Sequence, residues 1–198
     1  MRILVVGATG TVGREIVAAL STGHEVLRAS LHNAPITVDI ASASSIEEMY
    51  RQAGEVDAVI GAAGQAKFAP LRELAESDFI FSIENKLMGQ VNLVRLGFPS
   101  VRDGGSFTLT SGVLARTAMP GSAAVSLVNA AVEGFARAAA LEAPRGIRVN
   151  VVSPPWVTET LRALGMDPSQ GLPAATVARA YVESVTGSQT GETLEPKA

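Results

Sequence analysis

Residues 2–13 read RILVVGATGTVG, an apolar run that ends in three spaced glycines. The pattern predicts a strand over Arg2–Gly7 and a helix over Thr11–Leu20. Glycines at this turn allow a tight bend, a close approach to a pyrophosphate and a helix packed tightly on a sheet, because they lack Cβ. The free N–H groups of the helix N-terminus also attract phosphate. The stretch therefore predicts dinucleotide binding; a glycine turn with a purely structural role is the alternative.

Outward from this stretch, short apolar runs alternate with longer helical patterns. Such alternation is typical of right-handed βαβ crossovers. We expect an α/β fold: a Rossmann-like, doubly wound parallel sheet with helices on both faces, as one domain over residues 1–198. The expected strands are Glu25–Ser30, Ile36–Ile40, Val56–Gly61, Ser106–Ser111, Arg148–Val152 and Gly191–Glu195. One expected helix begins at a Ser45-x-x-Glu48 capping box, and the others cover Glu76–Leu96, Gly121–Ala143 and Pro173–Val185. Asp103–Gly105 is expected to form a turn.

Composition excludes several classes of function. The 198 residues include 16 Lys and Arg against 19 Asp and Glu, a net charge of −3, which argues against a broadly basic nucleic-acid binder and a polybasic membrane patch. The absence of Cys excludes disulfides and thiolate zinc sites, and 2 His make another metal site improbable, so no metal is expected. No targeting segment or unbroken apolar run of about 18 residues is present, so we expect a cytoplasmic protein without membrane or nucleic-acid partners.

The second expected strand bears on the choice of dinucleotide. NAD binders usually place Asp or Glu at the end of this strand to hold a ribose hydroxyl. Here the strand and its continuation read VLRASLH, without an acid at the end. A carboxylate there would repel a 2′-phosphate, so its absence favours NADP, with NAD as the alternative. Arg14, Arg28, Ser30 and His32 are candidate contacts to the 2′-phosphate, or else ordinary surface side chains.

Two later segments connect the chain to a known family. Residues 130–137 read AAVEGFAR and residues 144–154 read PRGIRVNVVSP, and over essentially its whole length the chain resembles the short-chain dehydrogenase/reductase family. The resemblance implies an adenine contact at Asp39, an N-A-A-G-type loop at Gly61–Gly64, and a strand and turn beside the nicotinamide at Asn150 and Pro154. The expected cofactor site comprises Gly7, Thr9, Gly10, Thr11, Val12, Gly13, Arg14, Ser30, Asp39, Ile40, Ala62, Ala63, Gly64, Asn129 and Pro154.

The family's catalytic Tyr-x-x-x-Lys pair is missing. Alignment of the AAVEG segment places Val125 at the tyrosine position and Asn129 at the lysine position. Hydride transfer to a carbonyl builds negative charge on oxygen, which a nearby acid must protonate. Val125 donates no proton, and Asn129 has no charge, although it can bind a ribose. The usual proton relay therefore cannot operate, and the two tyrosines, Tyr50 and Tyr181, lie elsewhere in the sequence.

Other residues offer a replacement proton source. Ser111 matches the region of the family's catalytic serine, although counting back from Val125 would place Gly112 there instead. Lys86, with Asn85 beside it, lies where the family usually has an active-site asparagine. The catalytic candidates are Ser111, Lys86 and Asn129, with Thr110 or a bound water as further proton sources. A solvated helix face is the alternative interpretation of Lys86, and a plain polar face that of the stripe Ser122, Ser126, Asn129 and Glu133.

These observations leave three functional hypotheses. The first is an NADP(H)-dependent oxidoreductase that acts on an unknown small-molecule carbonyl or alcohol with a non-standard proton donor. The second is a non-catalytic NADP(H)-binding sensor or regulatory module, and the third an isomerase or dehydratase that shuttles hydride internally. The family resemblance implies a homodimer or homotetramer. The short segment between Trp156 and Pro173 predicts a reduced substrate lid near residues 156–172.

Overall fold

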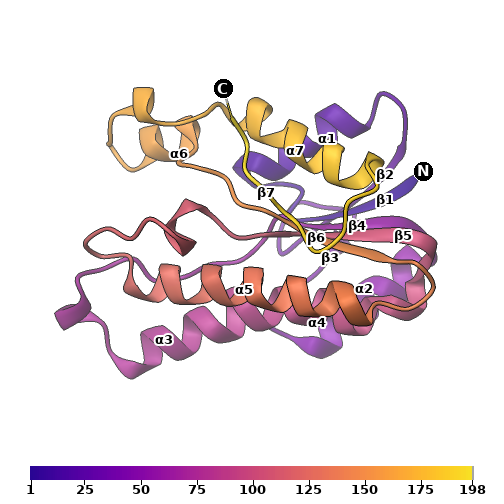
Figure 1. The fold of residues 1–198 in the computed structure, drawn as a ribbon, viewed down its shortest axis with the longest axis horizontal. Helices are drawn as coiled ribbons and strands as arrows, with labels where there is room; N and C mark the ends of the chain where they lie inside the picture. The colour runs from indigo at the N-terminus through magenta and orange to yellow at the C-terminus, as the bar shows by residue number, and fades with distance from the viewer. Residues whose placement is uncertain (198) are drawn as a thin grey trace.

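A computed structural model describes residues 1–197 as a sheet of seven parallel strands with helices on both faces (Figure 1). The strands are β1 (Arg2–Val6), β2 (Glu25–Ser30), β3 (Ile36–Thr37), β4 (Val56–Gly61), β5 (Val101–Thr110), β6 (Arg148–Val152) and β7 (Thr193–Leu194). The helices are α1 (Thr11–Leu20), α2 (Ala43–Ala53), α3 (Glu76–Ser82), α4 (Met88–Gly97), α5 (Ala123–Glu142), α6 (Thr158–Ala163) and α7 (Ala174–Thr186). The predicted doubly wound α/β fold is confirmed.

The strand order is β3-β2-β1-β4-β5-β6-β7. Helices α1 and α7 cover one face of the sheet, and α2, α4 and α5 cover the other (Figure 1). Alternate side chains of β1 supply the two cores: Leu4 and Val6 pack towards α2 and α4, whereas Ile3 and Val5 pack towards α1 and α7. The chain leaves β1 first for β2 and later returns on the other side to β4, so the sheet has a switch point where open α/β sheets bind ligands.

Several predicted boundaries need correction. The capping box at Ser45 was wrong, because Ser42 caps α2 by accepting a hydrogen bond from the Ser45 backbone N–H. The predicted strand Ile36–Ile40 pairs only over Ile36–Thr37. The predicted turn at Asp103–Gly105 lies inside β5, where the pairing moves from Val56–Val101 to Ala58–Ser106. Extra residues in β5 bulge out of the ladder there, so turn-forming residues do not end the strand.

The long helix predicted over Glu76–Leu96 is also interrupted. It consists of α3, a π-helical turn over Ile83–Leu87, and α4. Sequence periodicity favours one continuous α-helix here, because π-helical turns are rare and are not expected without structural information.

Helix α5 packs against the C-terminal strands β5 and β6 of the sheet. Within residues 1–197 it alone has the length and composition of a membrane-crossing helix. It packs on β6, and the side chains of Asn129 and Glu133 on its inner side are buried. These contacts make α5 part of the folded core.

Close packing between β1 and α1 depends on two glycines. Gly7 has a φ of +88°, and a Cβ there would lie 2.7 Å from the carbonyl carbon of Ala62. A Cβ on Gly13 would overlap the carbonyl oxygen of Gly7. Both positions require glycine because neighbouring backbone occupies the space of a side chain.

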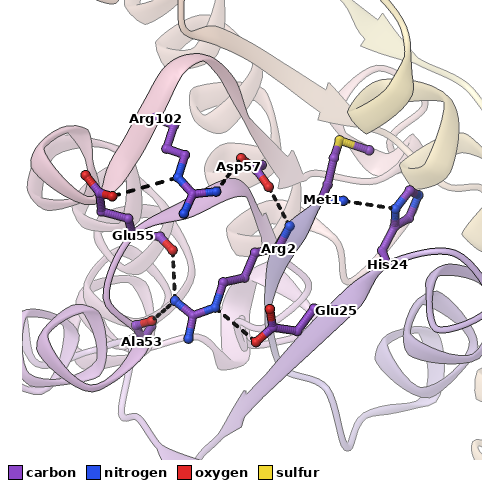
Figure 2. A network of polar contacts seen from close by, with 8 residues as sticks. All are labelled: Met1, Arg2, His24, Glu25, Ala53, Glu55, Asp57 and Arg102. Atoms are coloured by element: carbon purple, nitrogen blue, oxygen red, sulfur yellow. Dashed lines mark hydrogen bonds and ion pairs between the residues drawn. The ribbon is translucent and has the colours of Figure 1, made fainter.

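A polar network ties together the opposite, amino-terminal edge of the sheet (Figure 2). The Arg2 backbone N–H donates to Asp57 Oδ2 at 2.5 Å, and its guanidinium donates to the carbonyl oxygens of Ala53 and Glu55. Arg102 reaches Asp57 Oδ1 at 3.1 Å from β5. The hydrogen bond from Arg2, with a smaller contribution from Arg102, lowers the pKa of the Asp57 carboxyl group.

We expect Asp57→Asn to lower the free energy of unfolding at pH 7 by about 1–2 kcal/mol, because it removes charge-assisted hydrogen bonds. Since the folded-state pKa of Asp57 is lowered, its stabilisation is present above the ordinary pKa of 3.8 and is lost as the pH falls through the lowered value. Urea denaturation of wild type and variant should therefore converge in acid. Asp103→Asn, at a side chain that is 77% exposed, is the matched control and should change little. A difference that persists unchanged in acid would contradict the assignment.

We expect Gly13→Ala to lower the free energy of unfolding by about 1–3 kcal/mol, because the added methyl group forces α1 away from the loop. Gly134→Ala in α5 provides the control, since its Cβ would meet only Arg137 Nη2 at 3.8 Å. There the change should stabilise the protein by about 0.5–1 kcal/mol through helix propensity. Urea denaturation of both variants measures the two opposite signs, and equal effects would rule out the packing argument.

Candidate functional site

A pocket of about 300 Å³ opens at the carboxyl edge of the sheet, beside the switch point. Predicted cofactor residues that line it are Gly7, Thr9, Gly10, Ser30, Asp39, Ile40, Ala62, Ala63 and Gly64. The sequence analysis did not anticipate Val6, Leu31, Val38 and Gln65 in the lining; Asn85 also lines it. The predicted residues Thr11, Val12, Gly13, Arg14, Asn129 and Pro154 lie outside this lining. The glycine loop, the end of β2 and the loop after β4 thus form one pocket.

The N-cap of α1 lines this pocket, and the first turn of the helix follows directly behind it. Gly10 is the N-cap residue, and no side chain caps the helix. The N-terminal N–H groups of a helix without such a cap are available to an anion. Arg14 follows on the exposed surface of α1. The loop therefore fits a pyrophosphate both by its space and by its donors.

Ser30, at the end of β2, is held by the glycine loop. Its hydroxyl lies 2.9 Å from Thr9 Oγ1, which also donates to the carbonyl oxygen of His32 at 3.3 Å. Ser30 is buried, whereas Arg28, His32 and Leu31 are exposed. No carboxylate lies at the end of β2, as the sequence indicated.

Asp39 lies at the opposite wall of the pocket. Its Oδ1 accepts the backbone N–H of Ala41 at 3.0 Å, and its own N–H donates to Ser45 Oγ. These bonds hold Asp39 in a local turn with its side chain exposed. Ile40 follows it and is buried against Gly89 of α4, where a Cβ would lie 2.9 Å from Ile40 Cδ1.

Asn129, at the family's lysine position, has an unusual environment. The residue is 2% exposed, and its Oδ1 is a buried atom without a hydrogen-bond partner within residues 1–197. Its Nδ2 would lie 3.1 Å from a Cβ on Gly112. An unpaired buried oxygen is costly, so it suits a position that a hydroxyl donor from a ligand completes.

The structure shows which residue after β5 faces Asn129. It is Gly112, two residues beyond the end of the strand, so no side chain extends there. Ser111 is 3% exposed, and its hydroxyl donates to Glu133 Oε1 on α5 at 2.7 Å. Glu133 also accepts from Arg116, which in turn pairs with Glu195. The Ser111 hydroxyl proton is therefore committed to α5.

Thr110 and both tyrosines are likewise engaged elsewhere. The Thr110 hydroxyl donates to the Gly61 carbonyl oxygen at 2.6 Å and accepts from Tyr181 on α7 at 2.7 Å. Tyr50 donates to the carbonyl oxygen of Leu93. Burial raises the pKa of both tyrosines. Val125 carries no titratable group, so none of these residues presents an acid to the pocket.

Lys86 lies at the junction of α4 and β5. It extends from the π-helical turn, and its Nζ donates to the Ser111 carbonyl oxygen at 3.4 Å. Its stem packs over Gly64, where a Cβ would lie 3.0 Å from Lys86 Cγ. Burial lowers the pKa of Lys86 to about 8. The neighbouring Asn85 accepts the Gln65 N–H at 2.7 Å and so fixes the pocket wall. Of the two residues, only Lys86 carries a titratable group.

Remaining predicted positions have structural roles. The Asn150 side chain joins β6 to the segment before β7 by donating to the Gln189 carbonyl oxygen and accepting the Glu192 N–H. The Pro154 carbonyl oxygen accepts the Val113 N–H and so holds the turn after β6 against the turn after β5. In residues 1–197 no group of three or more His, Asp or Glu side chains is arranged to hold a metal ion.

One buried residue of this region was missed. Gln90 of α4 is fully buried and makes two hydrogen bonds to the backbone of Thr110. The available signal was a polar residue four positions after Lys86, in a helix that also carries Asn92 and Arg95. Sequence alone gives an amide at this position no partner, because the backbone that it binds lies on a distant strand.

Several known proteins are similar to this chain in sequence. A family model described as enoyl-(acyl carrier protein) reductase matches residues 12–192. A hydroxynaphthalene reductase of Aspergillus fumigatus is 33% identical over 117 residues, 58% of this chain and 42% of its own length. An uncharacterized oxidoreductase of Methylorubrum extorquens is 29% identical over 148 residues, 72% of this chain and 60% of its own length. The chain thus spans about half the length of these curated relatives.

Solved structures agree over nearly the whole chain. A protein from Listeria innocua is 44% identical, has a TM-score of 0.96, and is covered completely, as is this chain. A small-chain dehydrogenase crystallised with NADPH is 25% identical with a TM-score of 0.86, over 98% of this chain and 95% of that one. With the glycine loop, the parallel sheet and a family match across residues 12–192, the chain belongs to the short-chain dehydrogenase/reductase family.

Proposed function

We propose that this protein is an NADP(H)-dependent oxidoreductase that interconverts a carbonyl and an alcohol, with Lys86 as the proton donor. The placement of Lys86 carries the proposal, since Ser111 and Thr110 have committed their hydroxyl protons to Glu133 and Gly61. The names of the curated relatives, reductase and oxidoreductase, support the reaction class.

Lys86 has the properties of a general acid at neutral pH. When bound, a nicotinamide would supply the hydride for the carbonyl carbon, and the carbonyl oxygen would then require a proton. With a pKa of about 8, the Lys86 ammonium is protonated at neutral pH and releases its proton more readily than an ordinary lysine. Its contact with the Ser111 carbonyl, at 3.4 Å, is long and is easily exchanged for a substrate oxygen. Solvent reprotonates the amine after each turnover.

We assign NADP as the cofactor because the adenosine side of the pocket lacks an acid at the end of β2. Ser30 and Leu31 stand there, with Arg28, His32 and Arg14 exposed nearby on β2, its continuation and α1. The relative crystallised with NADPH supports this assignment. The orphan oxygen of Asn129 is our candidate for the nicotinamide ribose.

The segment after β6 is our candidate for a reduced substrate lid over residues 156–172. It contains α6 and a short 3-10 turn at Pro168–Gln170, and a bridge between Val157 and Leu172 closes its base. Trp156 packs edge to face on Phe68, with ring centroids 6.3 Å apart. The two aromatic rings thus link the loop after β4 to the proposed lid.

We also propose that the protein is cytoplasmic and forms a homodimer or homotetramer. An apolar groove between the outer faces of α4 and α5, lined by Val91, Phe98, Phe135 and Ala138 among others, supports the proposed oligomer.

Lys86→Met is expected to reduce kcat by about 10²–10⁴-fold on whichever carbonyl of a broad panel the wild type reduces, because it removes the proton donor. In wild type, carbonyl reduction should fall as the pH rises through about 8, since reduction requires the protonated amine, whereas alcohol oxidation should rise over the same range. NADPH oxidation followed by absorbance measures both profiles.

Lys86→Arg is the matched control, because arginine keeps the charge but does not release its proton at these pH values. It should be nearly as inactive as Lys86→Met. Full activity of either variant would remove Lys86 from the mechanism. NADPH binding without reduction of any carbonyl would instead favour a non-catalytic NADP(H)-binding module.

Leu31→Asp is expected to weaken NADPH binding by about tenfold or more, equivalent to about 1.4 kcal/mol, because a carboxylate at the end of β2 repels the 2′-phosphate. Leu31 lines the pocket and is 53% exposed, so the fold should tolerate the change. Calorimetric titration with NADPH and NADH should show selective loss of NADPH affinity. Leu31→Asn is the control, because asparagine has the shape of aspartate without its charge. Equal NADPH affinity of the two variants would refute the assignment.

A further inference from the structure

Two side chains of one helical segment hold consecutive residues at the end of β5. Gln90 Nε2 donates to the Thr110 carbonyl oxygen at 2.6 Å, and Gln90 Oε1 accepts the Thr110 N–H at 2.7 Å. Lys86 Nζ donates to the carbonyl oxygen of the next residue, Ser111. The helical segment that carries the proposed acid, Lys86, therefore also holds the Thr110–Ser111 backbone, to which Lys86 donates.

The hydrogen-bonding groups of the Thr110 backbone explain why the Gln90 side-chain amide is needed. The ladder between β4 and β5 ends at the pair Ile60–Thr108, whereas β5 continues to Thr110. Gln90 supplies to Thr110 the donor and the acceptor that a further residue of β4 would have supplied. Gly61 leaves the necessary room, since a Cβ there would lie 3.2 Å from Gln90 Oε1.

The far end of this junction is fixed from α5. Glu133 accepts the Ser111 hydroxyl, and Arg116, itself paired with Glu195, neutralises Glu133. These are the charged groups that meet at Ser111, beside the Lys86 contact. Thr110 is also held through its hydroxyl by Gly61 and Tyr181.

We propose that Gln90 is the positioning residue for Lys86: its amide holds the Thr110–Ser111 backbone in the orientation that presents the Ser111 carbonyl to the Lys86 ammonium. Lysine is a long, flexible side chain, and Lys86 leaves a π-helical turn, so a fixed acceptor is needed to define where its nitrogen lies. Lys86 adjoins the pocket, with its stem packed against the lining residue Gly64, whereas Gln90 acts only through Lys86. This inference rests on the proposed function only for its catalytic consequence, because the placement of Lys86 can be measured without turnover.

The test is the titration of Lys86 in Gln90→Met, which preserves side-chain length but removes the amide. Competitive acetylation, quantified by peptide mass spectrometry with Lys67 in the same molecule as reference, gives the midpoint for Lys86. Wild type should show a midpoint near 8, and Gln90→Met should move it by at least one unit towards the ordinary value of 10.5, as Lys86 leaves its buried acceptor. A folded Gln90→Met protein with an unchanged midpoint would overturn the proposal.

Ser184→Ala is the matched control. Ser184 is fully buried and lies 2.7 Å from Thr108 Oγ1, on the α7 side of the same strand. Its loss should destabilise the protein without moving the Lys86 midpoint. A shift equal to that of Gln90→Met would show that any weakening of β5 releases Lys86, and would contradict a specific role for Gln90.

A second measurement uses the wild-type fold, in case Gln90→Met does not fold. The side-chain amide resonance of Gln90 in ¹⁵N-labelled protein should shift with pH at the Lys86 midpoint, and the shift should vanish in Lys86→Met. A resonance insensitive to the Lys86 titration would count against the coupling. If the coupling is present but Lys86→Met remains an active reductase, Gln90 positions Lys86 while the assignment of Lys86 as the acid fails.

Discussion

The close backbone contact at the carboxyl end of β1 is the constraint on which the rest of the structure depends. Gly7 approaches Ala62 after β4, and Gly13 packs against the Gly7 carbonyl, so no side chain fits at either glycine. This contact lies beside the N-terminus of α1, which no side chain caps. Glycine at both positions permits the close backbone approach, and the glycine loop, the end of β2 and the loop after β4 form the pocket where they meet.

The proposed proton donor comes from the π-helical turn before α4 and not from α5. Helix α5 presents Val125 and an amide, Asn129, where the family has its catalytic pair, and Ser111 is turned towards Glu133. The proposed donor, Lys86, reaches the Ser111 carbonyl oxygen from that turn, and the burial that lowers its pKa also limits where its nitrogen can lie. A proton donor from a different helix can serve the same oxygen, because general acid catalysis requires a proton at the right distance and says nothing about which element carries it.

Much of the fold was predictable from local pattern, because each buried strand and amphipathic helix carries its own periodicity. Strands β2, β4 and β6 and helix α1 begin and end where the sequence predicted. The π turn, the bulge in β5 and the true cap of α2 were not predictable. The bulge reflects a tertiary demand, because it depends on how β5 pairs with β4. The cap of α2 is local, a bond from the Ser45 N–H to Ser42, and serines at 42, 44 and 45 made its position ambiguous in the sequence.

By itself, the sequence determined the parallel sheet, the glycine loop and the loss of the tyrosine and lysine, because residue types and their spacing carry this information. It also named Ser111, Thr110 and Lys86 as competing proton sources without ranking them. Only the tertiary structure separated them, by showing which hydroxyl protons are already donated: Ser111 to Glu133 and Thr110 to Gly61. A side chain's availability depends on partners that are distant in sequence, as it does for Gln90 and Thr110, and folding alone brings them together.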